Sequence, residues 1–115
     1  TPHRARPERI VNADSVPTPA TAVYALTKGA VSSFTRGLAR ELGPRNITVN
    51  NVQPGPINTE MNPDEGEFAD FLRPLTALGR YGKTSEVAAV VSFLAGPESA
   101  YVTGANVNVD GGFTV

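Results

Sequence analysis

Tyr24 and Lys28 place a phenol and an ammonium group four residues apart, in a segment with helical periodicity. On a helix, positions i and i+4 lie on the same face, so the two side chains would be neighbours. A free phenol titrates near pH ~10, and an adjacent cation lowers that pKa because it favours the phenolate. The pair could therefore act as a general acid–base, although a packed ring beside a solvated lysine has the same spacing.

A second candidate site is the turn from Pro54 to Thr59, which follows an apolar, β-branched segment. A proline donates no backbone hydrogen bond, and Gly55 would let a ligand approach the main chain closely. Such a turn could hold a flat polar group, such as a carboxamide. The alternative is an ordinary turn that ends a strand.

The surrounding helices and strands must position these candidate residues. The first half of the chain contains four segments with distinct structural patterns. The pattern predicts a strand, a proline-containing loop, a long helix and a second strand. Apolar residues recur every three or four positions in the helix from Val23 to Leu42, so we expect that stripe to be buried, and Gly43 and Pro44 end it. The four segments are Arg9–Asn12, Asp14–Thr21, Ala22–Leu42 and Ile47–Gln53.

The second half of the chain predicts two more helices and a short strand. Apolar residues from Phe68 to Leu78 follow a helical pattern that Pro74 breaks or kinks. Thr84 or Ser85 would cap a third helix, which Gly96 and Pro97 end. The residues Asn106–Val109 form the last predicted strand, and Gly111 and Gly112 follow it as a tight turn.

Strands that alternate with helices predict an α/β fold, in which a parallel sheet is covered on both faces. In such sheets, ligands bind outside the carboxyl ends of the strands. The turn from Pro54 to Thr59 follows the predicted strand Ile47–Gln53 and lies at one of these ends.

Composition excludes several classes of protein. The 115 residues include ten basic and eleven acidic side chains, for a net charge of −1, so a nucleic-acid partner is not expected. The absence of cysteine excludes disulfides and thiolate zinc sites and is compatible with a cytoplasmic location; we expect no metal site. We also expect no membrane segment, and a basic, disordered tail over residues 1–9.

Three phrases in order resemble the C-terminal half of the short-chain dehydrogenase/reductase family: residues 49–59, 79–82 and 102–112. The resemblance implies that residues 10–115 are the C-terminal portion of a single Rossmann-like domain, a doubly wound parallel sheet. Residues 53–56 and 61–63 are most similar to a branch that contains a cyclic di-GMP-binding oxidoreductase of biofilm dispersal. The β-ketoacyl carrier-protein reductases are a more distant match.

The resemblance also implies roles for particular residues. Tyr24 would exchange a proton with a carbonyl or secondary alcohol, and Lys28 would bind the ribose of NAD or NADP. Ile57 would meet the nicotinamide carboxamide within the turn Pro54-Gly55-Pro56, and Thr59 would reach the cofactor phosphates. Residues 60–73 would form a substrate lid, and the family assembles as dimers or tetramers.

Two features depart from the family pattern. The chain has no Gly-x-Gly sequence, and the N-terminal dinucleotide-binding half of the sheet is missing, so the strand Ile47–Gln53 is expected to lack neighbours. Ser15 is the only candidate for the catalytic serine, but it lies closer to Tyr24 than the family serine does. A serine in this context is by default a turn residue.

Three hypotheses about function follow. The chain is part of an NAD(P)-dependent oxidoreductase that acts on a small carbonyl or alcohol substrate. Alternatively, it belongs to a branch that binds cyclic di-GMP. As a third possibility, it is a catalytically inactive fragment that forms homo-oligomers through its helices.

Overall fold

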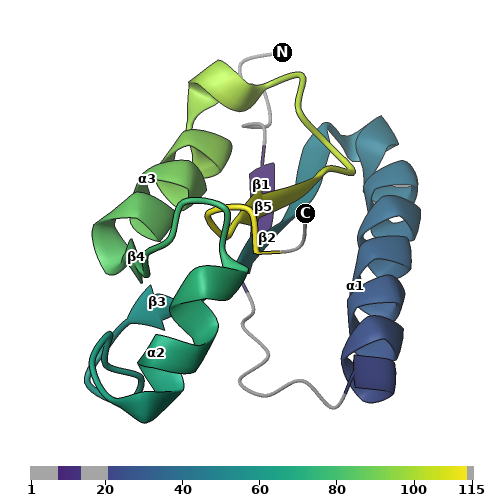
Figure 1. Ribbon diagram of the computed structural model, residues 1–115. Helices are drawn as coiled ribbons and strands as arrows, with labels where there is room; N and C mark the ends of the chain where they lie inside the picture. Colours follow the sequence, from purple (N-terminus) through teal and green to yellow (C-terminus); the bar gives the residue numbers. More distant parts are fainter. Residues whose placement is uncertain (1–7, 14–20, 114–115) are drawn as a thin grey trace.

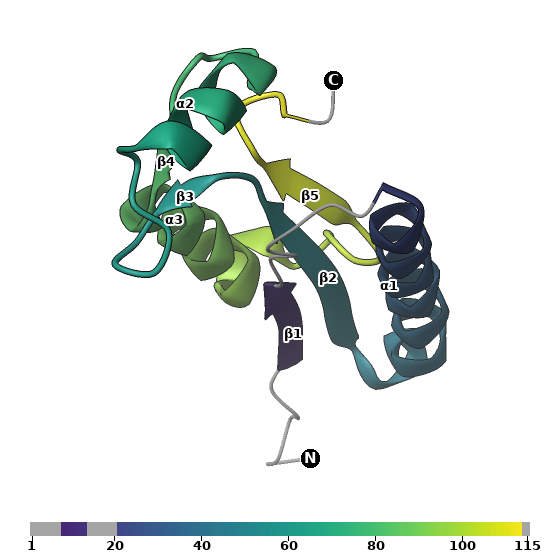
Figure 2. The ribbon, with the colours of Figure 1, turned by 60° about the horizontal axis from the view of Figure 1, so that its bottom comes forward.

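Three parallel strands form the central sheet in the computed structural model, which describes residues 8–13 and 21–113, without the side chains of residues 12, 13 and 21–25. The strand order is β1-β2-β5, with β1 at Glu8–Ala13, β2 at Ile47–Pro54 and β5 at Asn106–Val109. The helix α1 lies on one face of this sheet and α3 on the other (Figures 1 and 2). The predicted α/β architecture is therefore confirmed.

The central position of β2 corrects the expectation that this strand lacks neighbours. One edge of β2 pairs with β1 from Ile47 to Val52, and the other pairs with β5 from Asn51 to Pro54. Its first six residues are all buried, as is typical of a central parallel strand. The outer strands of this described three-stranded sheet are β1 and β5.

The strand β1 begins at Glu8, one residue before the predicted strand Arg9–Asn12, so the last two residues of the predicted tail lie in the sheet. They pair with Ile47 and Thr48 at the start of β2. Backbone pairing with β2 makes the strand one residue longer at each end than the predicted strand Arg9–Asn12. The predicted loop at Asp14–Thr21 lies outside the described residues, except for Thr21, which begins α1.

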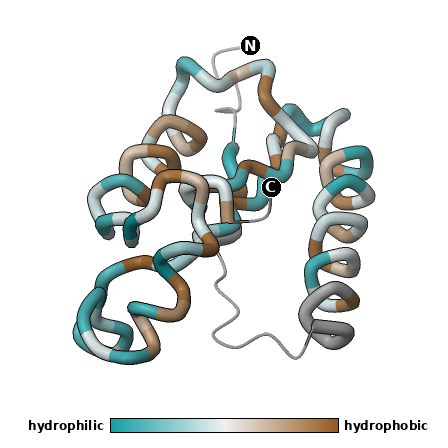
Figure 3. The backbone as a smooth tube through the Cα atoms, in the orientation of Figure 1, coloured by the Kyte–Doolittle hydropathy of each residue, from teal (hydrophilic) through white to brown (hydrophobic). Residues whose placement is uncertain are grey.

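The helix α1 spans Thr21–Leu42, as predicted, and the short 3-10 helix η1 at Gly43–Arg45 ends it. Its predicted buried stripe is wrong in the middle, because Leu26 and Phe34 are 74% and 67% exposed. The sheet contacts a neighbouring face, where Thr35 and Ala39 are buried. Figure 3 shows hydrophilic and hydrophobic positions mixed along the described part of this helix.

A second unit lies beyond the carboxyl ends of β2 and β5 (Figure 2). It consists of the helix α2 at Glu67–Leu72 and a two-stranded parallel sheet, β3 at Ile57–Asn58 with β4 at Gly82–Lys83. The 3-10 helix η2 at Arg73–Leu75 follows α2 and contains Pro74, which confirms the predicted break. Buried apolar side chains hold this unit together: Ala69, Leu72 and Tyr81, with Phe113 packed against them.

The helix α3 spans Thr84–Ala95 and ends at Gly96, before the 3-10 helix η3 at Pro97–Ser99, as predicted. Its cap differs from the prediction, because Lys83 and not Thr84 or Ser85 occupies the N-cap position. The Glu86 carboxylate accepts a hydrogen bond from the Lys83 backbone N–H at 2.9 Å. An acceptor three residues into the helix can satisfy the N-cap donor, so the start of the helix does not depend on a hydroxyl.

Candidate functional site

The first turns of α1 and the end of β2 meet at the same end of the sheet. The helix α1 packs against β2 and runs antiparallel to it, so Tyr24 and Lys28 lie towards the carboxyl ends of the strands (Figure 2). Lys28 is half-buried, and it makes no hydrogen bond or ion pair with the other described residues. The backbone of Tyr24 lies one turn before Lys28, while its side chain and all of Ser15 lie outside the described residues.

The turn after β2 is packed against the end of β5. The backbone N–H of Gly55 donates to the carbonyl of Val109 at 3.0 Å. A Cβ atom on Gly55 would lie 2.7 Å from Cβ and 2.8 Å from Cα of Asp110. The close approach that requires glycine here is therefore to the protein's own backbone, and the contact of Gly55 with a cofactor stays a prediction.

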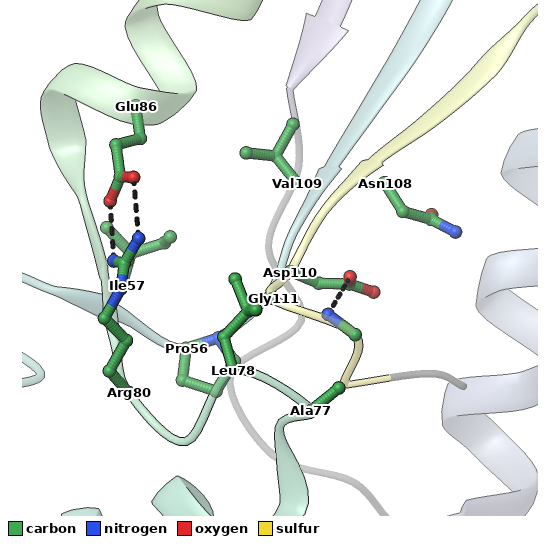
Figure 4. A pocket seen from close by; sticks show the side chains of 12 residues that line it. Pro56, Ile57, Ala77, Leu78, Arg80, Glu86, Asn108, Val109, Asp110 and Gly111 are labelled. Carbon is green, nitrogen blue, oxygen red and sulfur yellow. Dashed lines mark hydrogen bonds and ion pairs between the residues drawn. The ribbon is translucent and has the colours of Figure 1, made fainter.

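Two of the predicted cofactor residues, Pro56 and Ile57, line a cavity of about 410 Å³ (Figure 4). The side chains that α1 contributes to the described structure do not reach this cavity. Pro54 does not line the cavity and is the last residue of β2, where it pairs with Val109. The remaining lining residues come from the segment before β4, from α3 and from the end of β5: Ala77, Leu78, Arg80, Gly82, Glu86, Asn108, Val109, Asp110, Gly111 and Gly112.

Thr59 lies apart from the cavity and is exposed. Its backbone N–H donates to the carbonyl of Asn62 at 3.2 Å, and its hydroxyl accepts from the N–H of Asn62 at 3.1 Å. Pro56 and Ile57, in the middle of the predicted turn, therefore both line the cavity, whereas Thr59 lies in a separate small turn with Asn62.

An ion pair between Arg80 and Glu86 borders the cavity, and the sequence analysis did not identify it. The guanidinium binds the carboxylate through two hydrogen bonds of 2.9 and 3.0 Å (Figure 4). The Arg80 hydrogen bond and the Lys83 N–H lower the pKa of the Glu86 carboxyl to about 2. The signal available in the sequence was Glu86 in the first turn of a helix, six residues after Arg80.

We expect part of the folding stability to depend on pH through Glu86. Its pKa is lowered from 4.5 to about 2 in the folded chain, so the ion pair contributes fully above pH 4.5 and its contribution is lost as the pH falls towards 2. Acid titrations of thermal stability should show this loss in wild type. In Glu86→Gln the profile should be flatter between these pH values, and an unchanged profile would contradict the assignment.

The predicted tight turn after β5 is confirmed. Gly111 and Gly112 have φ values of 60° and 81°, which favour glycine. The carboxylate of Asp110 accepts the N–H of Gly112 at 2.9 Å, and the carbonyl of Gly111 accepts the N–H of Leu78 at 2.9 Å. This turn therefore closes one side of the cavity (Figure 4).

Tyr81 lies between Arg80 and Gly82, which line the cavity, but its environment opposes acid–base chemistry. The side chain is 5% exposed, and its hydroxyl has no hydrogen-bond partner among the described residues. Burial raises the pKa of Tyr81 above its ordinary value, and the nearby Arg73 opposes that change. The phenol of Tyr81 therefore stays protonated at neutral pH and packs against α2.

The described residues form neither a metal site nor a membrane-spanning helix. They contain no group of three or more His, Asp or Glu side chains that could hold a metal ion. None of the helices in this part of the chain is long and apolar enough to cross a membrane.

Comparison with known proteins identifies the family. The family model described as enoyl-(acyl carrier protein) reductase matches residues 2–114. The chain belongs to the short-chain dehydrogenase/reductase family. Its relatives include the cyclic-di-GMP-binding biofilm dispersal mediator protein of Escherichia coli K12, which is 50% identical over 103 residues. That alignment covers 90% of this chain and 44% of the relative.

Solved structures of this family agree with the fold. A short-chain dehydrogenase/reductase from Serratia marcescens BCRC 10948 is 56% identical with a TM-score of 0.85, over 93% of this chain and 46% of its own. A Burkholderia cenocepacia J2315 short chain dehydrogenase, solved in complex with NADP, is 43% identical with a TM-score of 0.85. That match covers 99% of this chain and 49% of the other.

The chain thus spans about half the length of the relatives it matches. The described sheet is part of a Rossmann-like fold, as predicted, and the assignment to a family of oxidoreductases is confirmed. The matched Burkholderia protein binds NADP, which agrees with the expected class of cofactor.

Proposed function

We propose that this chain contributes the acid–base end of an NAD(P)-dependent oxidoreductase that reduces a carbonyl or oxidises a secondary alcohol. One observation carries the proposal: the Tyr24–Lys28 turn of α1 and the turn after β2 lie at the same end of a parallel sheet. Ligands bind at this end in doubly wound folds. The family membership supports the same assignment.

In this proposal Tyr24 is the proton donor. Its hydroxyl gives a proton to the carbonyl oxygen of the substrate during reduction and takes it back during oxidation. The ammonium group of Lys28, four residues along the helix, stabilises the phenolate that forms when the proton leaves. The bound nicotinamide supplies or accepts the hydride.

The described residues fit a dinucleotide in three respects. The ammonium group of Lys28 has no partner among the described residues, so it is available to ribose hydroxyls. Pro56 and Ile57 line the cavity at the end of the sheet, where a carboxamide could bind next to an apolar side chain. Thr59 is exposed, and its hydroxyl can still donate to a phosphate, since the hydroxyl oxygen accepts the bond from the N–H of Asn62.

The first experiment is a titration of the 115-residue chain with NADPH and NADH, followed by nicotinamide fluorescence. We expect saturable binding, and we expect Lys28→Ala to weaken it by about tenfold, as the loss of a charged hydrogen bond predicts. Arg40→Ala is the matched control, because Arg40 is an exposed base on the same helix, near its opposite end. A folded chain that binds neither cofactor would contradict the proposal.

Two alternatives are tested with the same sample. The similarity to the Escherichia coli protein, whose name describes cyclic di-GMP binding, favours adding that nucleotide as a competitor. The exposed side chains of Leu26 and Phe34 on α1 favour self-association, which a measurement of oligomeric mass would show. A defined dimer or tetramer without cofactor binding would support an inactive, oligomerising chain.

A further inference from the structure

A row of side-chain amides crosses from β2 to β5 at the carboxyl end of the sheet. The register places Asn51 beside Asn106 and Gln53 beside Asn108. The amide of Asn51 donates to the side-chain oxygen of Asn106, and the amide of Asn106 donates to Gln53 at 3.2 Å. Asn51 is completely buried. Gln53 and Asn106 are half-buried, so the row is a continuous hydrogen-bonded network that is anchored by the buried Asn51 and reaches the surface at its other end.

This amide row lies on the face of the sheet that α1 covers. Ile47 and Val49 of β2 pack against Ala39 of α1. Side chains two residues apart on a strand share a face, so Asn51 and Gln53 continue the same face towards the carboxyl end. The interface with α1 therefore changes from apolar contacts to amides along β2.

The spacing of helix and strand shows which part of α1 meets the row. Two residues of a strand advance about 6.6 Å, which corresponds to about four residues of a helix. Because α1 runs antiparallel to β2, the turns that follow Ala39 along the sheet are those at Thr35 and then Val31. Thr35 is 4% exposed and donates its hydroxyl to the carbonyl of Val31 at 2.8 Å. Lys28 lies in the next turn.

We propose that Asn51 and Asn106 are positioning residues, which set the rotation and lateral position of the α1 turn that carries Tyr24 and Lys28. Apolar contacts such as Ala39 on Val49 tolerate sliding, whereas a hydrogen-bonded amide row anchored by the buried Asn51 admits few arrangements. A buried amide that loses its partner is costly, so the bonds between β2 and β5 fix the side-chain surface on which this part of the helix packs. The consequence for chemistry rests on the proposed function of Tyr24 and Lys28.

The test is Asn51→Leu, with Asn50→Leu as the matched control. Asn50 is also completely buried on β2, but it faces the other side and binds the carbonyl of Val102 and the N–H of Ala105 at 3.0 and 3.1 Å. Both variants should lose stability. Only Asn51→Leu should speed amide hydrogen exchange in residues 28–35 of α1, by about tenfold relative to residues 39–42.

A double variant, Asn51→Leu with Asn106→Leu, keeps the test decisive if the single variant does not fold, since apolar replacement of both partners can restore stability. Amide hydrogen exchange in residues 28–35 of this double variant should remain faster than in wild type. Wild-type protection there in a folded double variant, or equal effects of Asn51→Leu and Asn50→Leu, would overturn the inference.

Titration of the Tyr24 phenol by NMR separates the inference from the proposed function. A lowered pKa for Tyr24 in wild type that returns towards its ordinary value in the double variant supports both. An ordinary pKa in wild type would contradict the proposed acid–base role, while the exchange result would still decide whether the amide row positions α1.

Discussion

Replacing Tyr24 with Phe is expected to lower the kcat/KM of the proposed reductase by about 10²- to 10⁴-fold, the usual contribution of a positioned general acid–base. The change removes the hydroxyl proton and keeps the aromatic ring, so the fold and cofactor binding should be retained. The measurement is the rate of NADPH oxidation with a carbonyl substrate, together with a thermal unfolding curve for each variant.

Tyr101→Phe is the control for this prediction. Tyr101 is fully exposed and lies between η3 and β5, so loss of its hydroxyl should change neither rate nor stability. Equal activity of Tyr24→Phe and wild type would contradict the assigned proton donor. A loss of activity accompanied by unfolding would instead indicate a packing role for the hydroxyl.

The second large effect is on stability: Gly55→Ala is expected to lower the free energy of unfolding by about 1–3 kcal/mol, the usual cost of overpacking. The added Cβ would lie 2.7 Å from Cβ and 2.8 Å from Cα of Asp110, and the backbone of β5 cannot move without disturbing its pairing with β2. Chemical denaturation measures the change.

Gly37→Ala is the opposite control for Gly55. Gly37 is exposed on α1, and a Cβ atom there would meet nothing within 4 Å. Alanine in a helix interior should raise the free energy of unfolding by about 0.5–1 kcal/mol. If Gly55→Ala is instead as stable as wild type and weakens only cofactor binding, the turn serves a ligand, as the sequence first suggested.

Local signals in the sequence predicted most of the elements. The strand Asn106–Val109 has the predicted bounds, and the helix predicted from Ala22 begins one residue earlier, at Thr21. Pro74 breaks the α2 segment, and Gly96 ends α3. These features depend on hydrophobic periodicity and on the backbone geometry of proline and glycine, which act over a few residues.

Longer-range packing explains the expectations that were wrong. The periodicity of α1 marked Leu26 and Phe34 as apolar, but it could not show that the sheet contacts the face with Thr35 and Ala39 instead. Likewise, β2 was expected to lack neighbours. That β1 and β5 pair with its two edges is visible only in the folded chain. The lysine cap of α3 depends on where the Glu86 carboxylate lies.

The sequence by itself determined the family, the Tyr24–Lys28 spacing and the turn after β2, because each is encoded in residues close together in the chain. Tertiary structure alone decided that Gly55 meets Asp110, that Arg80 and Glu86 border the cavity, and that the buried amide of Asn51 on β2 bonds to Asn106 on β5. These contacts join segments up to 55 residues apart, and only the register of the sheet and the packing of α1 on its face bring them together.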